Sequence, residues 1–117
     1  LGLLEQERRE QLQALTDRIN KHVPRDEPMI IAGDFNDWRR RAEHHLHDDL
    51  DLQELFVEMR GRHARTFPVW APLLPVDRVY YRGLQPVECG RLSKGPWRDL
   101  SDHAALFGVF SIQGTST

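Results

Sequence analysis

Residues 28–36 read PMIIAGDFN, a short apolar run that ends in a glycine followed by polar residues. An apolar run of this length between a proline and a glycine predicts a buried β-strand. Polar residues directly after a buried strand lie where many α/β folds place ligands. Asp34 and Asn36 stand two positions apart, so their side chains point to the same side of an extended chain. This stretch predicts a strand and a candidate site together.

The flanking sequence alternates between helical and strand patterns. Apolar residues at helical spacing predict an amphipathic helix from Leu4 to His22, ended by Pro24, and short helices at residues 39–46 and 51–59. Alternating β-rich segments predict strands at residues 76–81, 86–92 and 104–112, with a turn at residues 94–97. The resulting order of elements is a mixed α/β or α+β pattern, of which we favour α+β in the form of an α/β sandwich.

Composition excludes several classes of protein. The chain has 117 residues, which suits one domain, and its 39% hydrophobic content excludes disorder driven by charge. A formal net charge of −2 argues against a generic polyanion binder, which neutralises many phosphates with surplus Lys and Arg. No apolar run approaches the roughly 20 residues of a membrane span. The single cysteine, Cys89, excludes an internal disulfide and is compatible with the cytoplasm, the location we favour while the compartment stays open.

Three aspartates stand at the ends of predicted strands: Asp34, Asp77 and Asp102. Carboxylates can hold Mg²⁺ or Mn²⁺, and the imidazole of the adjacent His103 can bind phosphate or move a proton. These groups suit phosphodiester hydrolysis, which needs an oriented water and neutralised phosphate charge. Taken singly, a Gly-Asp pair is most often a turn, and an Asp-His pair is most often a helix cap or a surface pair.

Taken together and in order, these pieces resemble a known family. GDFN at residues 33–36, VDRV at 76–79 and SDH at 101–103 look like the last three motifs of the endonuclease/exonuclease/phosphatase superfamily. That superfamily includes DNase I-like nucleases, abasic-site endonucleases, inositol-phosphate phosphatases and sphingomyelinases. Thr66-Phe67 also fits the pattern. The resemblance covers residues 1–112 and implies a DNase I-like fold, here with one mixed or antiparallel sheet flanked by helices.

The resemblance implies a role for each matching residue. Asp34 is similar to the residue that orients or deprotonates the attacking water, and Asn36 to a donor that binds a phosphate oxygen. Asp77 is similar to the carboxylate that pairs with the last histidine and fixes its ring. His103 is similar to the histidine that contacts the scissile phosphate. These four residues are the predicted catalytic set.

Metal and substrate contacts are predicted at three further positions. Asp102 resembles a carboxylate at or near the divalent-metal site, which would hold Mg²⁺ or Mn²⁺. Arg78 and Arg98 stand near the motifs and are candidates for contacts with substrate charge. The resemblance implies a metal-dependent phosphoesterase acting on a phosphate ester. Nucleic acid, phospholipid headgroups and inositol phosphates all remain open as substrates.

The family's earlier half, with its metal-binding Glu, has no counterpart in residues 1–117. The chain therefore resembles the C-terminal half of such a domain. An isolated half is expected to expose an apolar sheet face and to form a homodimer through it. An alternative function follows from the missing Glu: a catalytically inactive folded fragment or self-associating module.

Two other clusters have competing interpretations. His44 and His47 could share a helical face and bind a metal, but exposed histidine runs are usually polar surface, and we favour that interpretation. Arg60, Arg62 and Arg65 form a basic patch. This patch either lies beside the substrate groove or is only a charged loop.

Overall fold

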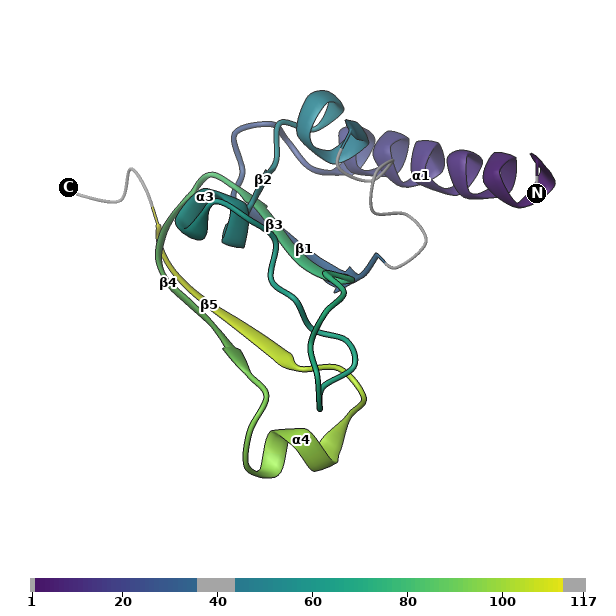
Figure 1. The fold of residues 1–117 in the computed structure, drawn as a ribbon. Helices are drawn as coiled ribbons and strands as arrows, with labels where there is room; N and C mark the ends of the chain where they lie inside the picture. Colours follow the sequence, from purple (N-terminus) through teal and green to yellow (C-terminus); the bar gives the residue numbers. More distant parts are fainter. Residues whose placement is uncertain (1, 36–43, 113–117) are drawn as a thin grey trace.

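The computed structural model describes residues 2–35 and 44–112 (Figure 1). In chain order its elements are α1 (Gly2–His22), β1 (Met29–Asp34), the π-helical segment η2 (His44–Asp49), β2 (Gln53–Glu54), α3 (Leu55–Arg60), β3 (Asp77–Arg82), β4 (Leu84–Leu92), α4 (Pro96–Leu100) and β5 (Ala105–Ile112). Helices and antiparallel strand pairs are both present, as the predicted α+β class requires.

The strands form two sheets rather than the one that the sequence predicted. The first has the order β1-β3-β2, and the second is the hairpin β4-β5. The prediction of one sheet is wrong because the chain leaves the first sheet at Gly83, which alone connects β3 to β4. Gly83 has a φ of +73°, and a Cβ there would lie 3.0 Å from the backbone of Pro28. This turn requires glycine.

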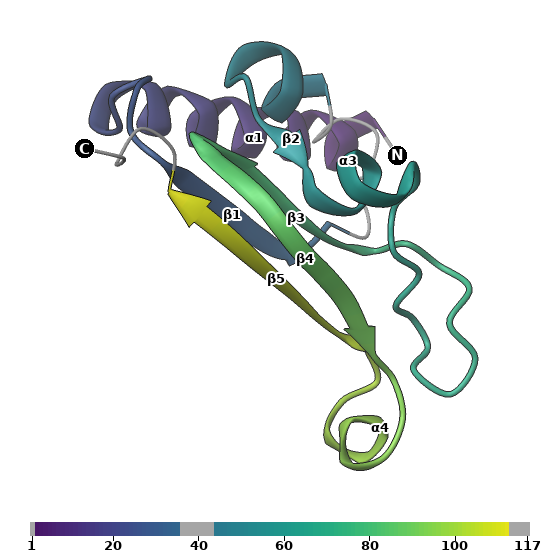
Figure 2. The same ribbon diagram turned by 90° about the vertical axis from the view of Figure 1, so that its left-hand side faces the viewer.

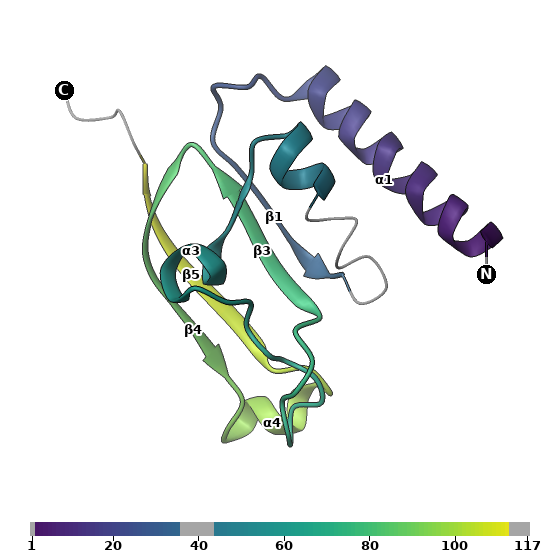
Figure 3. The same cartoon turned by 45° about the horizontal axis from the view of Figure 1, so that its top comes forward.

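One hydrophobic core lies between the first sheet and the helical layer formed by α1 and η2, which Figure 3 shows along one face of that sheet. Tyr80 of β3 sits at its centre and meets the Phe35 ring edge-on, with the ring centroids 5.5 Å apart. The other buried members are Leu12, Ile19, Leu46, Leu50 and Leu52. The predicted amphipathic helix is therefore a packing helix.

A second core lies on the opposite side of β3. Tyr81 follows Tyr80 directly, and because side chains alternate along a strand it points to the other face. There it packs with Leu55 and Phe56 of α3 and with Cys89 of the hairpin. Figure 2 shows the hairpin crossing this side of the first sheet. Burial raises the pKa of the Tyr81 hydroxyl above its usual value, and the nearby carboxylates of Glu58 and Glu54 raise it further.

Several helices and strands begin or end at residues other than those predicted from the sequence. The helix predicted for residues 51–59 begins only at Leu55, because Gln53 and Glu54 pair with β3 instead. The turn predicted around residue 96 is the helix α4, with Pro96 at its first turn. The strand predicted as buried, β1, is only partly covered: Ile30 is 49% exposed. The helix predicted for residues 39–46 falls largely outside the described residues.

The hairpin also exposes large apolar side chains, with Val109 at 45% and Ile112 at 60%. Ile30 of the first sheet is exposed as well. Val109 and Ile112 are three positions apart on β5 and so point to opposite faces of the hairpin; the exposed apolar sheet face expected from the sequence stays a prediction. Homodimer formation through this surface stays a prediction. Within the described residues, no helix is both long enough and apolar enough to cross a membrane.

The carboxylate of Glu54 ties β2, α3 and β3 together. It is 6% exposed, and its two oxygens accept from different backbone amides: Oε1 from Val57 at 2.9 Å and Oε2 from Val79 at 3.0 Å. The first contact caps α3. The second extends the ladder on β3 past the point where the short strand β2 ends.

We expect Glu54→Ala to lower the free energy of unfolding by about 2–4 kcal/mol, because a cap is worth about 1 kcal/mol and a buried unsatisfied amide costs about 1–3 kcal/mol. Urea denaturation followed by circular dichroism measures the change. Glu58→Ala, an exposed glutamate on the same helix, is the matched control and should stay within about 0.5 kcal/mol of the parent. Equal losses in both variants would contradict a special role for Glu54.

Candidate functional site

Two aspartates face each other across the first sheet. In the antiparallel pairing of β1 with β3, Asp34 lies directly opposite Asp77, so both side chains are on the same face. Like charges opposite one another destabilise a sheet. Asp34 is half exposed and Asp77 is largely covered, with side-chain exposures of 49% and 18%. Such a pair is expected where a third group offsets the repulsion.

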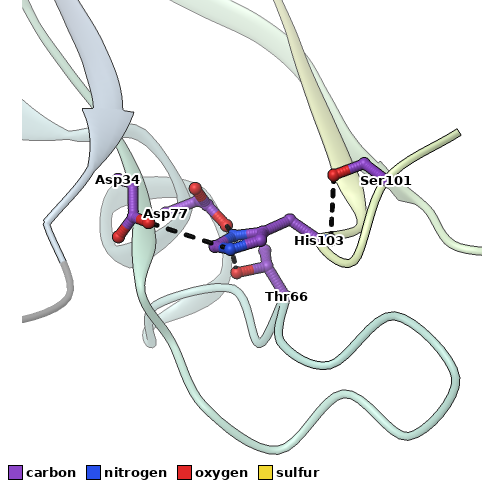
Figure 4. Close-up of polar contacts among 5 residues, drawn as sticks. All are labelled: Asp34, Thr66, Asp77, Ser101 and His103. Atoms are coloured by element: carbon purple, nitrogen blue, oxygen red, sulfur yellow. Dashed lines mark hydrogen bonds and ion pairs between the residues drawn. The ribbon is translucent and has the colours of Figure 1, made fainter.

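That third group is His103, which precedes β5 and reaches across from the hairpin (Figure 4). Its Nδ1 lies 2.6 Å from Asp77 Oδ2, and its Nε2 lies 3.8 Å from Asp34 Oδ2. An ionised carboxylate can only accept, so Nδ1–H is the donor to Asp77. The imidazole therefore lies between the two carboxylates, with Nε2 directed toward the more open one.

Three further residues hold this arrangement. The Thr66 hydroxyl donates to the same Asp77 oxygen at 2.5 Å, so Oδ2 accepts from both Thr66 and His103. The Phe67 ring packs against the imidazole, with ring centroids 4.9 Å apart. Ser101 Oγ accepts from the backbone N–H of His103 at 3.1 Å. The histidine is thereby fixed through one ring nitrogen, one ring face and its main chain.

Two backbone hydrogen bonds join the segments that carry these residues. The Ala104 N–H donates to the Thr66 carbonyl at 2.8 Å, and the Val69 N–H donates to the Asp102 carbonyl at 2.6 Å. The loop after residue 65 and the segment before β5 are therefore clamped to each other. This clamp positions Thr66 and His103 around Asp77, which belongs to the other sheet.

The remaining predicted residues lie elsewhere or outside the description. Arg78 is on the opposite face of β3 from Asp77; it is 5% exposed and its Nη1 donates to the Tyr80 hydroxyl at 3.0 Å. The Asp102 side chain is exposed beside His103. Asn36 falls outside the described residues, and for Arg98, in α4, only the backbone is described. Their predicted roles stay predictions.

The sequence does not reveal the roles of three residues: Thr66, Phe67 and Ser101. Thr66-Phe67 fits the motif pattern, but the pattern predicts no contact for either side chain. The position of Thr66 and Phe67 just before the second motif could have indicated these roles. A hydroxyl followed by an aromatic ring can hold an acid–histidine pair from two directions. Ser101 was quoted only as part of its motif, and its hydroxyl orients the backbone of His103.

Asp34, Asp77 and His103 also form a group that could hold a metal ion. One ligand atom from each lies within 4.8 Å of the others. Two of the three donors are carboxylate oxygens, which suit Mg²⁺ and Mn²⁺. The motif resemblance predicts the metal contact at Asp102 instead. The two aspartates are contributed by neighbouring strands and the histidine by the hairpin, so the group exists only when the two sheets are docked.

Comparisons with known proteins agree with the motif pattern. The profile of the Endonuclease/Exonuclease/phosphatase family matches residues 2–103. YbhP of Escherichia coli strain K12, named an uncharacterized protein, is 46% identical over 106 residues, which cover 91% of this chain and 42% of YbhP. A UPF0294 protein of Yersinia pseudotuberculosis is 38% identical over 104 residues, covering 86% of this chain and 35% of the relative.

A UPF0294 protein of Vibrio cholerae is 36% identical over 110 residues, covering 92% of this chain and 35% of the relative. The chain thus spans less than half the length of these relatives. No solved structure matches the chain. The profile match covers most of the chain and includes Asp34, Asp77 and His103. On this evidence the chain belongs to the endonuclease/exonuclease/phosphatase family.

Proposed function

We propose that this chain carries part of the catalytic centre of a divalent-metal-dependent phosphoesterase, which hydrolyses a phosphate ester with an activated water. Family membership suggests phosphoesterase or nuclease activity in general terms. The observation that carries the finer proposal is the contact of His103 with Asp77, together with the approach of its free ring nitrogen to Asp34. An acid that orients a histidine beside a second, open acid provides the groups for proton transfer at a reacting phosphate.

Each residue has a distinct task in this proposal. Asp34 is half exposed, so its carboxylate can orient a water and accept its proton. His103 Nε2 lies on the same side and contacts an oxygen of the phosphoryl group, donating a hydrogen bond in its protonated form. Asp77 and Thr66 keep the imidazole in place and are positioning residues. Asn36 would donate a further hydrogen bond to the phosphate.

The donor set fits a hard divalent cation. Asp34 would supply a carboxylate oxygen to Mg²⁺ or Mn²⁺, and Mg²⁺ commonly keeps several waters when it has few protein ligands. Asp102 stays a proposed ligand from the motif resemblance, and its exposed side chain is not among the three whose ligand atoms lie within 4.8 Å of one another. When bound, the ion supplies positive charge that stabilises the phosphoryl group and lowers the pKa of a water. Asp77 is less available as a ligand, because its Oδ2 already accepts two hydrogen bonds.

Metal dependence is the test of this function. The intact protein is incubated with bis(p-nitrophenyl) phosphate and with p-nitrophenyl phosphate, in Mg²⁺, in Mn²⁺ or in EDTA. We expect release of nitrophenolate with either metal and a loss of at least about 10²-fold in EDTA, the scale of a missing electrostatic contact. Turnover that is equal in EDTA and in metal contradicts the proposal. The two substrates separate diesterase from monoesterase activity.

Exposed apolar side chains on both sheets favour a second candidate function, a self-associating module. Ile30, Val109 and Ile112 are all close to half exposed or more. Sedimentation of the chain across a range of concentrations distinguishes the two. A dimer without metal-dependent turnover supports self-association, and a monomer with turnover supports the phosphoesterase.

A further inference from the structure

A pocket apart from the acid–histidine group lies between the end of α3 and the hairpin. Its volume is about 490 Å³, within the range of small-molecule sites. The segment at residues 62–65, the middle of β4 and Phe107 of β5 line it. Phe107 pairs with Gly90, and its ring occupies the space that a Cβ at residue 90 would need. Phe56 and Phe107 thus give the pocket apolar walls.

Positive charge dominates the lining. Four arginines contribute to it, namely Arg60, Arg62, Arg65 and Arg91, against one carboxylate, Glu88. We call this site the arginine pocket. No ion pair joins these arginines to a carboxylate within the part of the chain that the structure describes. Four guanidinium groups around one hollow repel each other, and the single carboxylate of Glu88 offsets only part of that charge. The arginine pocket is therefore locally positive in a chain whose formal net charge is −2.

Two of the four arginines are anchored in place. Arg60 Nη2 donates to the Cys89 carbonyl at 2.7 Å, and its guanidinium carbon lies 6.0 Å from the centroid of the Phe56 ring. Arg91 Nη1 donates to the Arg65 carbonyl at 3.1 Å. These contacts use one nitrogen of each guanidinium and leave other N–H donors for a ligand. The exposed side chains of Arg62 and Arg65 form no hydrogen bond or ion pair with other described residues.

The pocket is connected to the acid–histidine group by consecutive residues. Arg65 lines the pocket, and the next residue, Thr66, donates to Asp77. Arg91 holds the Arg65 carbonyl, while Ala104, next to His103, holds the Thr66 carbonyl. The backbone of Arg65 and Thr66 is therefore held by hydrogen bonds from the pocket on one side and from the segment beside His103 on the other.

We propose that the arginine pocket binds a phosphate group that the substrate carries in addition to the one that is hydrolysed. Arginine pairs with phosphate through two parallel N–H···O bonds, which suits a multiply charged, compact anion. The apolar walls accommodate the organic part that bears it. The assignment of this phosphate to the substrate rests on the proposed phosphoesterase function. The pocket's affinity for phosphate does not depend on turnover. The substrate class is then an ester with at least two phosphates.

The first experiment measures binding without catalysis. Inorganic phosphate is titrated, in EDTA, into the isotopically labelled chain and followed by NMR of backbone amides. We expect saturable shifts at Ala64, Gly90 and Phe107. Arg62→Gln/Arg65→Gln should weaken binding about tenfold or more, because two charge-assisted contacts are lost. Arg9→Gln, an exposed arginine of α1, is the matched control and should bind as the parent does. Equal affinity in the double variant and the parent overturns the proposal.

The second experiment asks whether the phosphate belongs to the substrate. The intact protein receives p-nitrophenyl esters of thymidine 5′-phosphate, with and without a 3′-phosphate. We expect the double variant to raise KM about tenfold for the doubly phosphorylated ester alone, with kcat kept. Identical behaviour of the two esters, with phosphate binding intact, means that the pocket holds free phosphate and overturns the substrate assignment. Phosphate binding without hydrolysis of any ester contradicts the proposed function while leaving the pocket in place.

Discussion

Asp34→Asn is expected to reduce turnover of a phosphodiester by the intact protein about 10²–10⁴-fold, the range for removal of a general base. The amide keeps the shape of the side chain but cannot accept the water's proton. Because Asp34 faces Asp77 across the sheet, the change also removes a repulsion, so the fold should keep its stability. Initial rates at saturating Mg²⁺, together with thermal unfolding, give both numbers.

Asp26→Asn is the matched control, because Asp26 is exposed in the turn before β1 and away from the acid–histidine group. Its rate should match that of the parent. A second comparison is the pH profile, since loss of a base removes the acidic limb of the rate curve. Undiminished turnover by Asp34→Asn would falsify the role given to Asp34.

His103→Gln is expected to reduce kcat about 10²–10³-fold, the scale of a lost contact to developing charge on the phosphoryl group. The glutamine amide can still donate to Asp77, but it cannot offer a titratable nitrogen at the same place. The effect should appear mainly in kcat, because the contact is made at the reacting group rather than along the rest of the substrate. Steady-state kinetics on both p-nitrophenyl esters measure it.

Positioning residues should give smaller losses in a defined order. Asp77→Asn is expected to cost about 10–100-fold, as for groups that orient a functional histidine, and Thr66→Val less than about tenfold. The imidazole proton resonance near Nδ1 should shift in both variants, a signature that a general loss of stability does not produce. A loss in Thr66→Val as large as in His103→Gln contradicts the assigned order.

The arrangement of the candidate site could be predicted from the sequence better than the architecture that builds it. Asp77 and His103 were paired from the motif resemblance, and the structure places their polar atoms 2.6 Å apart. Motif residues could be found because their identity is fixed by chemistry and their order by the chain. Asp34 was placed at a strand end, and the register opposite Asp77 then followed from the antiparallel pairing.

The division into two sheets could not be predicted from local pattern. Residues 77–82 and 84–92 have similar strand signals, and only the backbone angle at Gly83 separates them into different sheets. Arg78 shows a related difficulty. Its place beside Asp77 in the sequence suggested a shared site, yet strand alternation directs it to the opposite face, where it contacts Tyr80. Residues of one strand share a face only when they are an even number of positions apart.

The single-residue connection at Gly83 has a mechanical consequence. β4 leads away from it for nine residues, and β5 begins at the far end of that hairpin, just after His103. At about 3.3 Å per residue, β3 places Gly83 roughly 20 Å from Asp77 and therefore from the imidazole that contacts it. A rotation of about 3° at this joint would displace the imidazole by roughly 1 Å, enough to cost about 10²-fold in rate. The backbone clamp between residues 66–69 and 102–104, together with the contacts of Thr66 and His103 with Asp77, would then be what holds the far end of the hairpin against such a rotation.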